Sequence, residues 1–265
     1  IKFIFFNSLG EGVMKINEVK ANAFGMPITS PSDLKIEYKM RGREYFTIAY
    51  ETDINILKEV VPEPLKVVSN VVKFEFMYMP DASGFGSFYE AGQMIEVEYD
   101  GVIGLYSHSM YLNDLAPIAA GREIWGYPKK FGTPTLGVDC DTLLGTLKYN
   151  SVMVAQGTMG FKYTELDKQA VQKTMSESPI FLLKIIPHVN AKAASICQLV
   201  RCYVSDVHVH GAWSGPAALQ LFEHALAPVA QLPVHKIISG THIVADVTLP
   251  GGEIIYDYLK GNTDD

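Results

Sequence analysis

Residues 117–132 read PIAAGREIWGYPKKFG, and the interpretation of the whole chain begins from this stretch. Pro117 and Gly126 have the spacing expected for the first turn of a short helix and the residue just past its end. Pro128 then prevents the helix from continuing and favours an extended chain. The sequence therefore predicts a short helix followed by an extended segment that carries two adjacent lysines.

The lysine pair consists of Lys129 and Lys130, which lie between Pro128 and Phe131. Because successive side chains of an extended segment point to opposite sides, we expect the two amines to diverge. If one amine faces an apolar cavity, partial dehydration favours its neutral, nucleophilic form. The alternative is an ordinary solvated corner after a helix, in which both amines remain in water.

Length and composition suit a globular chain with a large core. The 265 residues are 48% hydrophobic and 19% charged, which is typical of globular proteins. The net charge of −7 argues against a nucleic-acid partner, because such proteins normally present a basic face. Cys140, Cys197 and Cys202 lack metal-ligand spacing and predict free thiols in a reducing compartment, so we expect a cytoplasmic protein.

Residues 1–13, IKFIFFNSLGEGV, are expected to lie outside the folded domain. Their apolar part is too short to span a membrane, and its flanks lack the layout of a signal peptide, so no membrane association is expected. Met14 and the residues after it resemble an ordinary start. We therefore predict an N-terminal extension over 1–13, or a segment that contacts another subunit, and a single domain over 14–265.

Several segments have the composition and alternation of β-strands. In residues 73–79, aromatic side chains alternate with a second set that includes Glu75, which predicts a strand with two different faces. Asp100 and Gly101 are typical of a tight hairpin turn. The predicted strands lie at 44–50, 73–79, 94–99 and 102–106, with more within 134–162, 194–213 and 236–249.

Fewer segments have the pattern of helices. Asp53 is a suitable N-cap for a short helix, and residues 168–175 are a second candidate. Residues 216–226 are a third candidate, because Leu219 and Leu226 share one face at helical spacing. Many strands with few helices predict one antiparallel, barrel-like domain.

Eight segments together resemble acetoacetate decarboxylase, and they occur in the order of that family between about residue 28 and residue 260. They are REYFTIAYETD, VVPEPL, GREIWGYPKKFG, DTLLGTL, TMGFKY, LLKIIP, LQLFEHALAP and IYDYLK. The resemblance implies a β-dominated α+β fold, an antiparallel cone-shaped β-barrel with flanking helices. It also implies a large homo-oligomer (a dodecamer in the family) and a reaction on a small β-keto acid that needs no cofactor.

The same resemblance implies roles for individual residues. Lys129 matches the first lysine of the family's YPKK motif, the amine that forms a Schiff base, and the family is itself an established example of an activated lysine. Arg43 and Glu90 match its active-site arginine and glutamate. The further residues expected at the substrate pocket are Glu75, Tyr127 and Lys130.

Without the resemblance, these residues have simpler interpretations. Arg43 and Glu90 then form a surface ion pair, which contributes little to stability, and Glu75 lies on a solvated strand face. Decarboxylation consumes a negative charge, so a cation bound tightly to the substrate carboxylate would stabilise the starting state. We therefore expect Arg43 to hold Glu90 or to guide the anion inward. Glu90 either repels the departing carboxylate or assists proton movement.

The expected function is decarboxylation of acetoacetate to acetone and carbon dioxide through a Schiff base on Lys129. One alternative is a related Schiff-base enzyme that runs aldol or dehydration chemistry on a longer keto acid. Another is a non-catalytic barrel that binds small acids or lipids. His208 and His210 share one strand face and are candidate metal ligands, but no third ligand has suitable spacing, so no metal is expected.

Overall fold

The chain divides into two compact units, residues 1–36 and 37–265. The computed structural model describes residues 13–32 of the first unit and residues 37–260 of the second. Within the first unit, α1 (Ile16–Asn22) is a short helix with no buried residue. Apart from Val13, the predicted N-terminal extension lies outside the described residues. No helix in the described ranges has the length and apolar character needed to cross a membrane.

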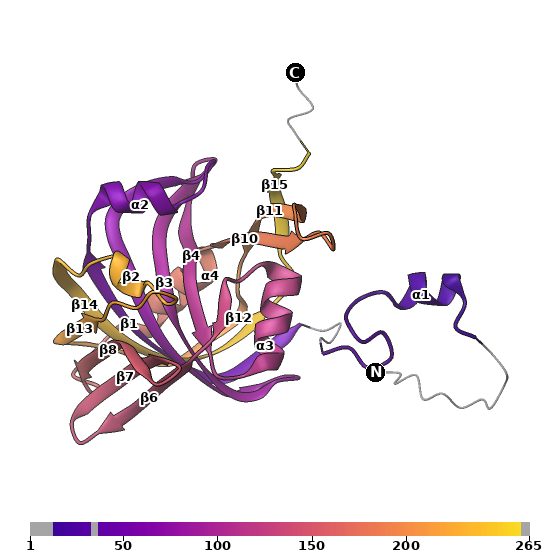
Figure 1. The fold of residues 1–265 in the computed structure, drawn as a ribbon. Helices are drawn as coiled ribbons and strands as arrows, with labels where there is room; N and C mark the ends of the chain where they lie inside the picture. Colours follow the sequence, from indigo (N-terminus) through magenta and orange to yellow (C-terminus); the bar gives the residue numbers. More distant parts are fainter. Residues whose placement is uncertain (1–12, 33–36, 261–265) are drawn as a thin grey trace. The chain divides into compact units, whose positions relative to one another are not determined.

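The second unit is built mainly of strands, which confirms the predicted β-dominated α+β class. Its large sheet has the order β15-β11-β10-β4-β3-β2-β1-β14-β12-β9, with β5 beside β4. The strands are β1 (Tyr38–Glu51), β2 (Lys66–Ala82), β3 (Gly86–Tyr99), β4 (Val102–Leu112), β5 (Lys129–Phe131), β9 (Thr164–Glu165), β10 (Ile180–Pro187), β11 (Ala194–Cys202), β12 (Ser205–Gly215), β14 (Lys236–Leu249) and β15 (Glu253–Asp257). Figure 1 shows β1 to β4 side by side and strongly curved.

A second sheet has the order β13-β8-β7-β6. Its strands are β6 (Thr133–Asp139), β7 (Thr142–Tyr149), β8 (Val152–Gly160) and β13 (Ala217–Leu221). All neighbours in this sheet are antiparallel. In the large sheet, β4 is parallel to both β5 and β10, and the other pairs are antiparallel.

The alternation along the long strands assigns their two faces. Phe46 on β1 and Phe74 and Phe76 on β2 are fully buried, in one apolar cluster with Leu143 and Leu147 of the second sheet. The side chains that alternate with these residues point to the opposite face, where a second apolar cluster and a cavity lie. The predicted two-faced strand at 73–79 is therefore confirmed.

The helices of the second unit are short. They are α2 (Ile54–Val60), α3 (Leu115–Ala120), the π-helix η1 (Gly121–Trp125), α4 (Lys168–Glu177) and the 3₁₀-helix η2 (Val229–Gln231). The predicted cap of α2 is confirmed, because the Asp53 carboxylate accepts from the amide of Asn55 at 2.8 Å. The predicted helix at 168–175 is α4.

The predicted helix over residues 216–226 is wrong. Residues 217–221 form the edge strand β13, which pairs with β8 from Leu219 opposite Gly157 to Leu221 opposite Ala155. Leu219 is buried, whereas Leu226 is 62% exposed. The helical spacing of the two leucines was coincidental, because Leu219 belongs instead to a strand with one buried face.

The stretch at 117–132 has the predicted organisation, with one addition. Helix α3 begins slightly earlier than Pro117, at Leu115, and η1 then continues it with a single wide turn. Gly126 ends this turn in the left-handed conformation, with φ of 92°, which glycine adopts without a steric penalty. The extended segment that follows is β5.

Candidate active site

A cavity of about 340 Å³ lies on the face of the large sheet opposite the second sheet. Residues of β1, β2, β3, β4 and β14 line it, together with Lys129 of β5 and Met175 of α4. Most of its lining is apolar and includes the flexible side chains of Met40, Met77, Met94 and Met110. The charged side chains of this lining are Arg43, Lys73, Glu75, Glu90 and Lys129.

Lys129 and Glu90 form an ion pair in the cavity wall. The Lys129 Nζ lies 2.8 Å from Glu90 Oε1, and the two side chains are 10% and 6% exposed. Strand β4 lies between them, since Met110 pairs with Lys129 and Leu112 pairs with Glu90. Glu90 Oε1 nevertheless accepts no hydrogen bond of suitable geometry from the described residues. The two charges are therefore close and largely buried, without an aligned hydrogen bond between them.

Arg43 is the second cation beside Glu90. Its Nη2 lies 3.6 Å from Glu90 Oε2, which is an electrostatic contact longer than a hydrogen bond. The guanidinium also lies 4.4 Å from the centre of the Tyr45 ring and 2.9 Å from the sulfur of Met77. Burial disfavours the cation, but the surrounding Tyr45, Glu90, Tyr127 and Glu75 together outweigh this effect, and the pKa of Arg43 is raised above its ordinary value.

Glu75 lies further along the same wall, on β2. Burial raises the pKa of its carboxyl, while Arg43 and Lys73 act in the opposite direction. The hydroxyl of Thr47 lies 3.5 Å from Glu75 Oε1. Compared with an exposed glutamate, Glu75 is thus shifted towards the protonated form, which donates a hydrogen bond.

The Tyr127 ring lies beside the lysine amine. Its ring centre lies 5.3 Å from the Lys129 Nζ, and its side chain packs edge to face against Trp125. Burial raises the pKa of Tyr127 well above its ordinary value, so its hydroxyl stays protonated at neutral pH. The amine therefore has an aromatic ring and a carboxylate as neighbours.

Lys130 lies away from this cavity, although the sequence placed it among the pocket residues. Its Nζ donates a hydrogen bond to the main-chain carbonyl of Leu226 and lies 5.0 Å from the ring centre of Tyr149. The expected divergence of the two amines is confirmed, because the Lys129 amine contacts Glu90 at the cavity, whereas the Lys130 amine contacts the Leu226 carbonyl.

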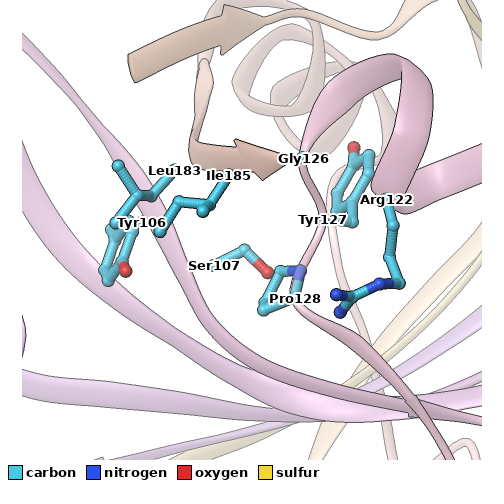
Figure 2. Close-up of a pocket in the computed structure, with 8 residues that line it drawn as sticks. All are labelled: Tyr106, Ser107, Arg122, Gly126, Tyr127, Pro128, Leu183 and Ile185. Atoms are coloured by element: carbon cyan, nitrogen blue, oxygen red, sulfur yellow. The ribbon is translucent and has the colours of Figure 1, made fainter. Parts of the chain in front are cut away.

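A second cavity, of about 240 Å³, shares Tyr127 with the first. Figure 2 shows Ser107 and Pro128 between Tyr106 on one side and Arg122 on the other. Neither Lys129 nor Glu90 lines this cavity. Its lining residues are Tyr106, Ser107, Arg122, Gly126, Tyr127, Pro128, Leu183 and Ile185.

The histidine pair lies elsewhere on the large sheet, on β12. The rings of His208 and His210 are 4.8 Å apart, and His210 Nε2 lies 2.9 Å from Asp246 Oδ1. No group of three or more His, Cys, Asp or Glu in the described ranges is arranged to hold a metal ion. All three cysteines are free thiols.

Several residues of the cavity were not predicted from the sequence. Tyr45 and Thr47 alternate along β1 with the buried core residues Phe46 and Ile48. That period-2 pattern was available from the sequence as a sign of a second buried face. Met175 of α4 gave no comparable sign, because its position in the cavity depends on how the helix packs against the sheet.

Comparisons with known proteins agree on one family. The sequence model of the family described as acetoacetate decarboxylase (ADC) matches residues 25–259. The acetoacetate decarboxylase of Bordetella avium is 55% identical over 246 residues, which cover 93% of this chain and 99% of the relative.

Solved structures show the same likeness. One, from structural studies of acetoacetate decarboxylase, is 48% identical with a TM-score of 0.89 and covers 93% of this chain and 100% of the other. The acetoacetate decarboxylase of Legionella pneumophila is 43% identical with a TM-score of 0.83, covering 95% of this chain and 99% of that one.

Proposed function

The chain belongs to the acetoacetate decarboxylase family, and we infer that it is an enzyme that converts acetoacetate and a proton to acetone and carbon dioxide. Relatives of that name are more than 50% identical over almost their whole length. The observation that carries the proposal is the amine of Lys129, which lies 2.8 Å from Glu90 in a mainly apolar cavity.

We propose that Lys129 acts as the nucleophile. Its neutral amine adds to the ketone of acetoacetate, and loss of water gives an iminium ion. The bond between the α-carbon and the carboxylate then breaks, carbon dioxide leaves, and the electron pair moves through the α-carbon to the iminium nitrogen as an enamine. Protonation of the carbon and hydrolysis release acetone and restore the amine.

The position of Arg43 supports the expectation that it does not clamp the substrate carboxylate. Its contact with Glu90 at 3.6 Å already places an anion beside the guanidinium. A tightly bound cation would stabilise the carboxylate that the reaction must consume. We propose that Arg43 holds Glu90, and that Glu90 acts on the substrate by repelling its carboxylate or by assisting proton movement.

Glu75 and the cavity walls complete the proposed site. Burial raises the pKa of Glu75, and its carboxyl lies on the wall of the same cavity as Lys129. We propose that Glu75 and Tyr127 bind and orient the substrate, while the methionine side chains exclude water. Lys130 is assigned a structural role, through its hydrogen bond to the Leu226 carbonyl.

Carbon dioxide release from acetoacetate is the test of this function. The purified protein and its Lys130→Met variant should both release carbon dioxide, whereas Lys129→Met should not. A protein that binds keto acids without releasing carbon dioxide would be the non-catalytic alternative. Condensation or dehydration of a longer keto acid without carbon dioxide release would indicate the related Schiff-base chemistry.

Four wider proposals follow from family membership. We propose that the curved sheet belongs to the cone-shaped barrel that the family resemblance implies, with a TM-score of 0.89 to a family structure in support. We also propose a homo-oligomer, and a cytoplasmic location, which the three free thiols favour. Residues 14–265 are proposed to act as one functional domain, to which residues 1–13 contribute no catalytic group.

A further inference from the structure

Gly121 lies directly against the end of the Lys129 side chain. A Cβ atom at Gly121 would lie 2.5 Å from Lys129 Cδ, 2.7 Å from Cε and 3.0 Å from Nζ. Non-bonded carbon atoms have their optimal separation at about 3.5–4.0 Å. Any side chain at this position therefore occupies the space in which the lysine now lies.

The backbone conformation of Gly121 does not by itself require glycine. Its φ of −59° and ψ of −40° are ordinary right-handed helical values, which alanine adopts more favourably than glycine. Gly126, five residues later, is different, because its φ of 92° lies in the left-handed region. The reason for a glycine at position 121 is therefore the space that it leaves beside Lys129.

The main chain around Lys129 is held by the same turn. The Gly121 carbonyl accepts hydrogen bonds from the amides of Gly126 at 2.9 Å and Tyr127 at 3.0 Å. The next residue, Arg122, donates from Nη1 to the Lys129 carbonyl at 3.1 Å. With both main-chain segments fixed, the flexible lysine side chain is the part that moves when a methyl group is added at Gly121.

We propose that Gly121 is a positioning residue for the reaction: its missing side chain provides the space that lets the Lys129 amine reach Glu90 and the cavity. This inference rests on the proposed role of Lys129 as the nucleophile. A displacement of a reacting group by about 1 Å can lower turnover by about 100-fold. The Gly121→Ala substitution moves the amine by a comparable distance and should have an effect of that size.

The test compares Gly121→Ala with Gly137→Ala. Gly137 lies on β6, and a Cβ added there meets nothing within 4 Å, so this variant controls for the glycine-to-alanine change itself. Both variants should keep the melting temperature of the unmodified protein. Gly121→Ala should lower kcat by about 100-fold, whereas Gly137→Ala should leave it unchanged.

A second readout reports the amine directly. Acetone condenses with the lysine without any decarboxylation, and borohydride reduces the iminium to an isopropyl-lysine that mass spectrometry locates. The rate of labelling at Lys129 should fall in Gly121→Ala and stay unchanged in Gly137→Ala. Unchanged turnover and labelling in Gly121→Ala would overturn the inference. Absence of label from Lys129 in the unmodified protein would instead reject the proposed mechanism.

If Gly121→Ala fails to fold, the double variant Gly121→Ala/Lys129→Ala shows whether the contact with Lys129 is the cause. The second substitution removes the atoms that the new methyl group meets. Recovery of a folded double variant would support the contact between positions 121 and 129. A double variant that is still unfolded would place the conflict elsewhere and overturn the inference.

Discussion

The buried contact between Arg43 and Glu90 predicts that these residues act as a unit in turnover. Their charged atoms are 3.6 Å apart, and the side chains are 12% and 6% exposed. At an effective dielectric constant of about 20, the gross attraction at this distance is about 5 kcal/mol. Loss of hydration offsets much of it, and contacting residues usually couple by about 0.5–3 kcal/mol. We expect a coupling near the middle of that range, about 2 kcal/mol or 30-fold in rate.

The perturbation is a double-mutant cycle of Arg43→Ala and Glu90→Ala. Each single variant should lower kcat/KM for carbon dioxide release strongly. Arg43→Ala leaves the Glu90 carboxylate with Lys129 as its one cationic contact among the described residues, and Glu90→Ala leaves the buried Arg43 guanidinium without its carboxylate. The double variant should retain about 30-fold more activity than the product of the two single effects predicts. Strictly multiplicative losses would refute the reasoning, since they would show that the two residues work independently.

An exposed ion pair that also includes an arginine of β1 supplies a control. Arg41 of β1 and Asp81 of β2 form an ion pair at 3.1 Å, with both side chains 58% exposed. Exposed pairs of this kind contribute about 0–1 kcal/mol. The cycle of Arg41→Ala and Asp81→Ala should therefore show little coupling in kcat/KM. Equal coupling in both cycles would mean that burial at the cavity is not the cause.

Three further predictions concern Glu75, Lys130 and the N-terminus. Because burial raises the pKa of Glu75, the protein loses stability as pH rises through this pKa, so Glu75→Gln should raise the melting temperature at neutral pH. This gain in melting temperature should vanish below about pH 4, near the pKa of an unfolded glutamate. The control Glu59→Gln, at an exposed position, should show no such gain. A gain that does not depend on pH would contradict the prediction. Lys130→Gln should move the midpoint of the acidic limb of the kcat/KM profile against pH by less than about one pH unit. A move of several units would show that repulsion between the two lysines has a major effect. A protein that begins at Met14 should keep its turnover and subunit count, and loss of either would assign residues 1–13 a structural part in the assembly.

The local structure of residues 117–132 could be predicted from the sequence, because it depends on residues that are close together in the chain. Proline and glycine fix the ends of the helical segment, and the extended conformation after Pro128 separates the two lysine side chains. The alternation at 73–79 likewise predicted two faces of a strand. The roles of Arg43 and Glu90 came from family resemblance, since nothing local relates positions that lie 47 residues apart.

Other features depend on long-range pairing that a local pattern does not encode. The contact between Lys129 and Glu90 exists because β4 lies between β3 and β5. The strand at 217–221 was mistaken for a helix because its pairing with β8 overrides a short helical coincidence. Gly121 has an ordinary helical conformation, so only its distance from a residue eight positions later shows why a side chain is excluded there.

The central claim is that Lys129 forms the covalent intermediate, and borohydride trapping during turnover of acetoacetate tests it most directly. Reduction in the presence of substrate should stop catalysis and add an isopropyl group to the peptide that contains Lys129 and Lys130. Fragmentation of that peptide should place the added mass on Lys129, and Lys129→Met should remain unlabelled while Lys130→Met is labelled normally. A label on another lysine, or turnover that continues without any label, would contradict the account.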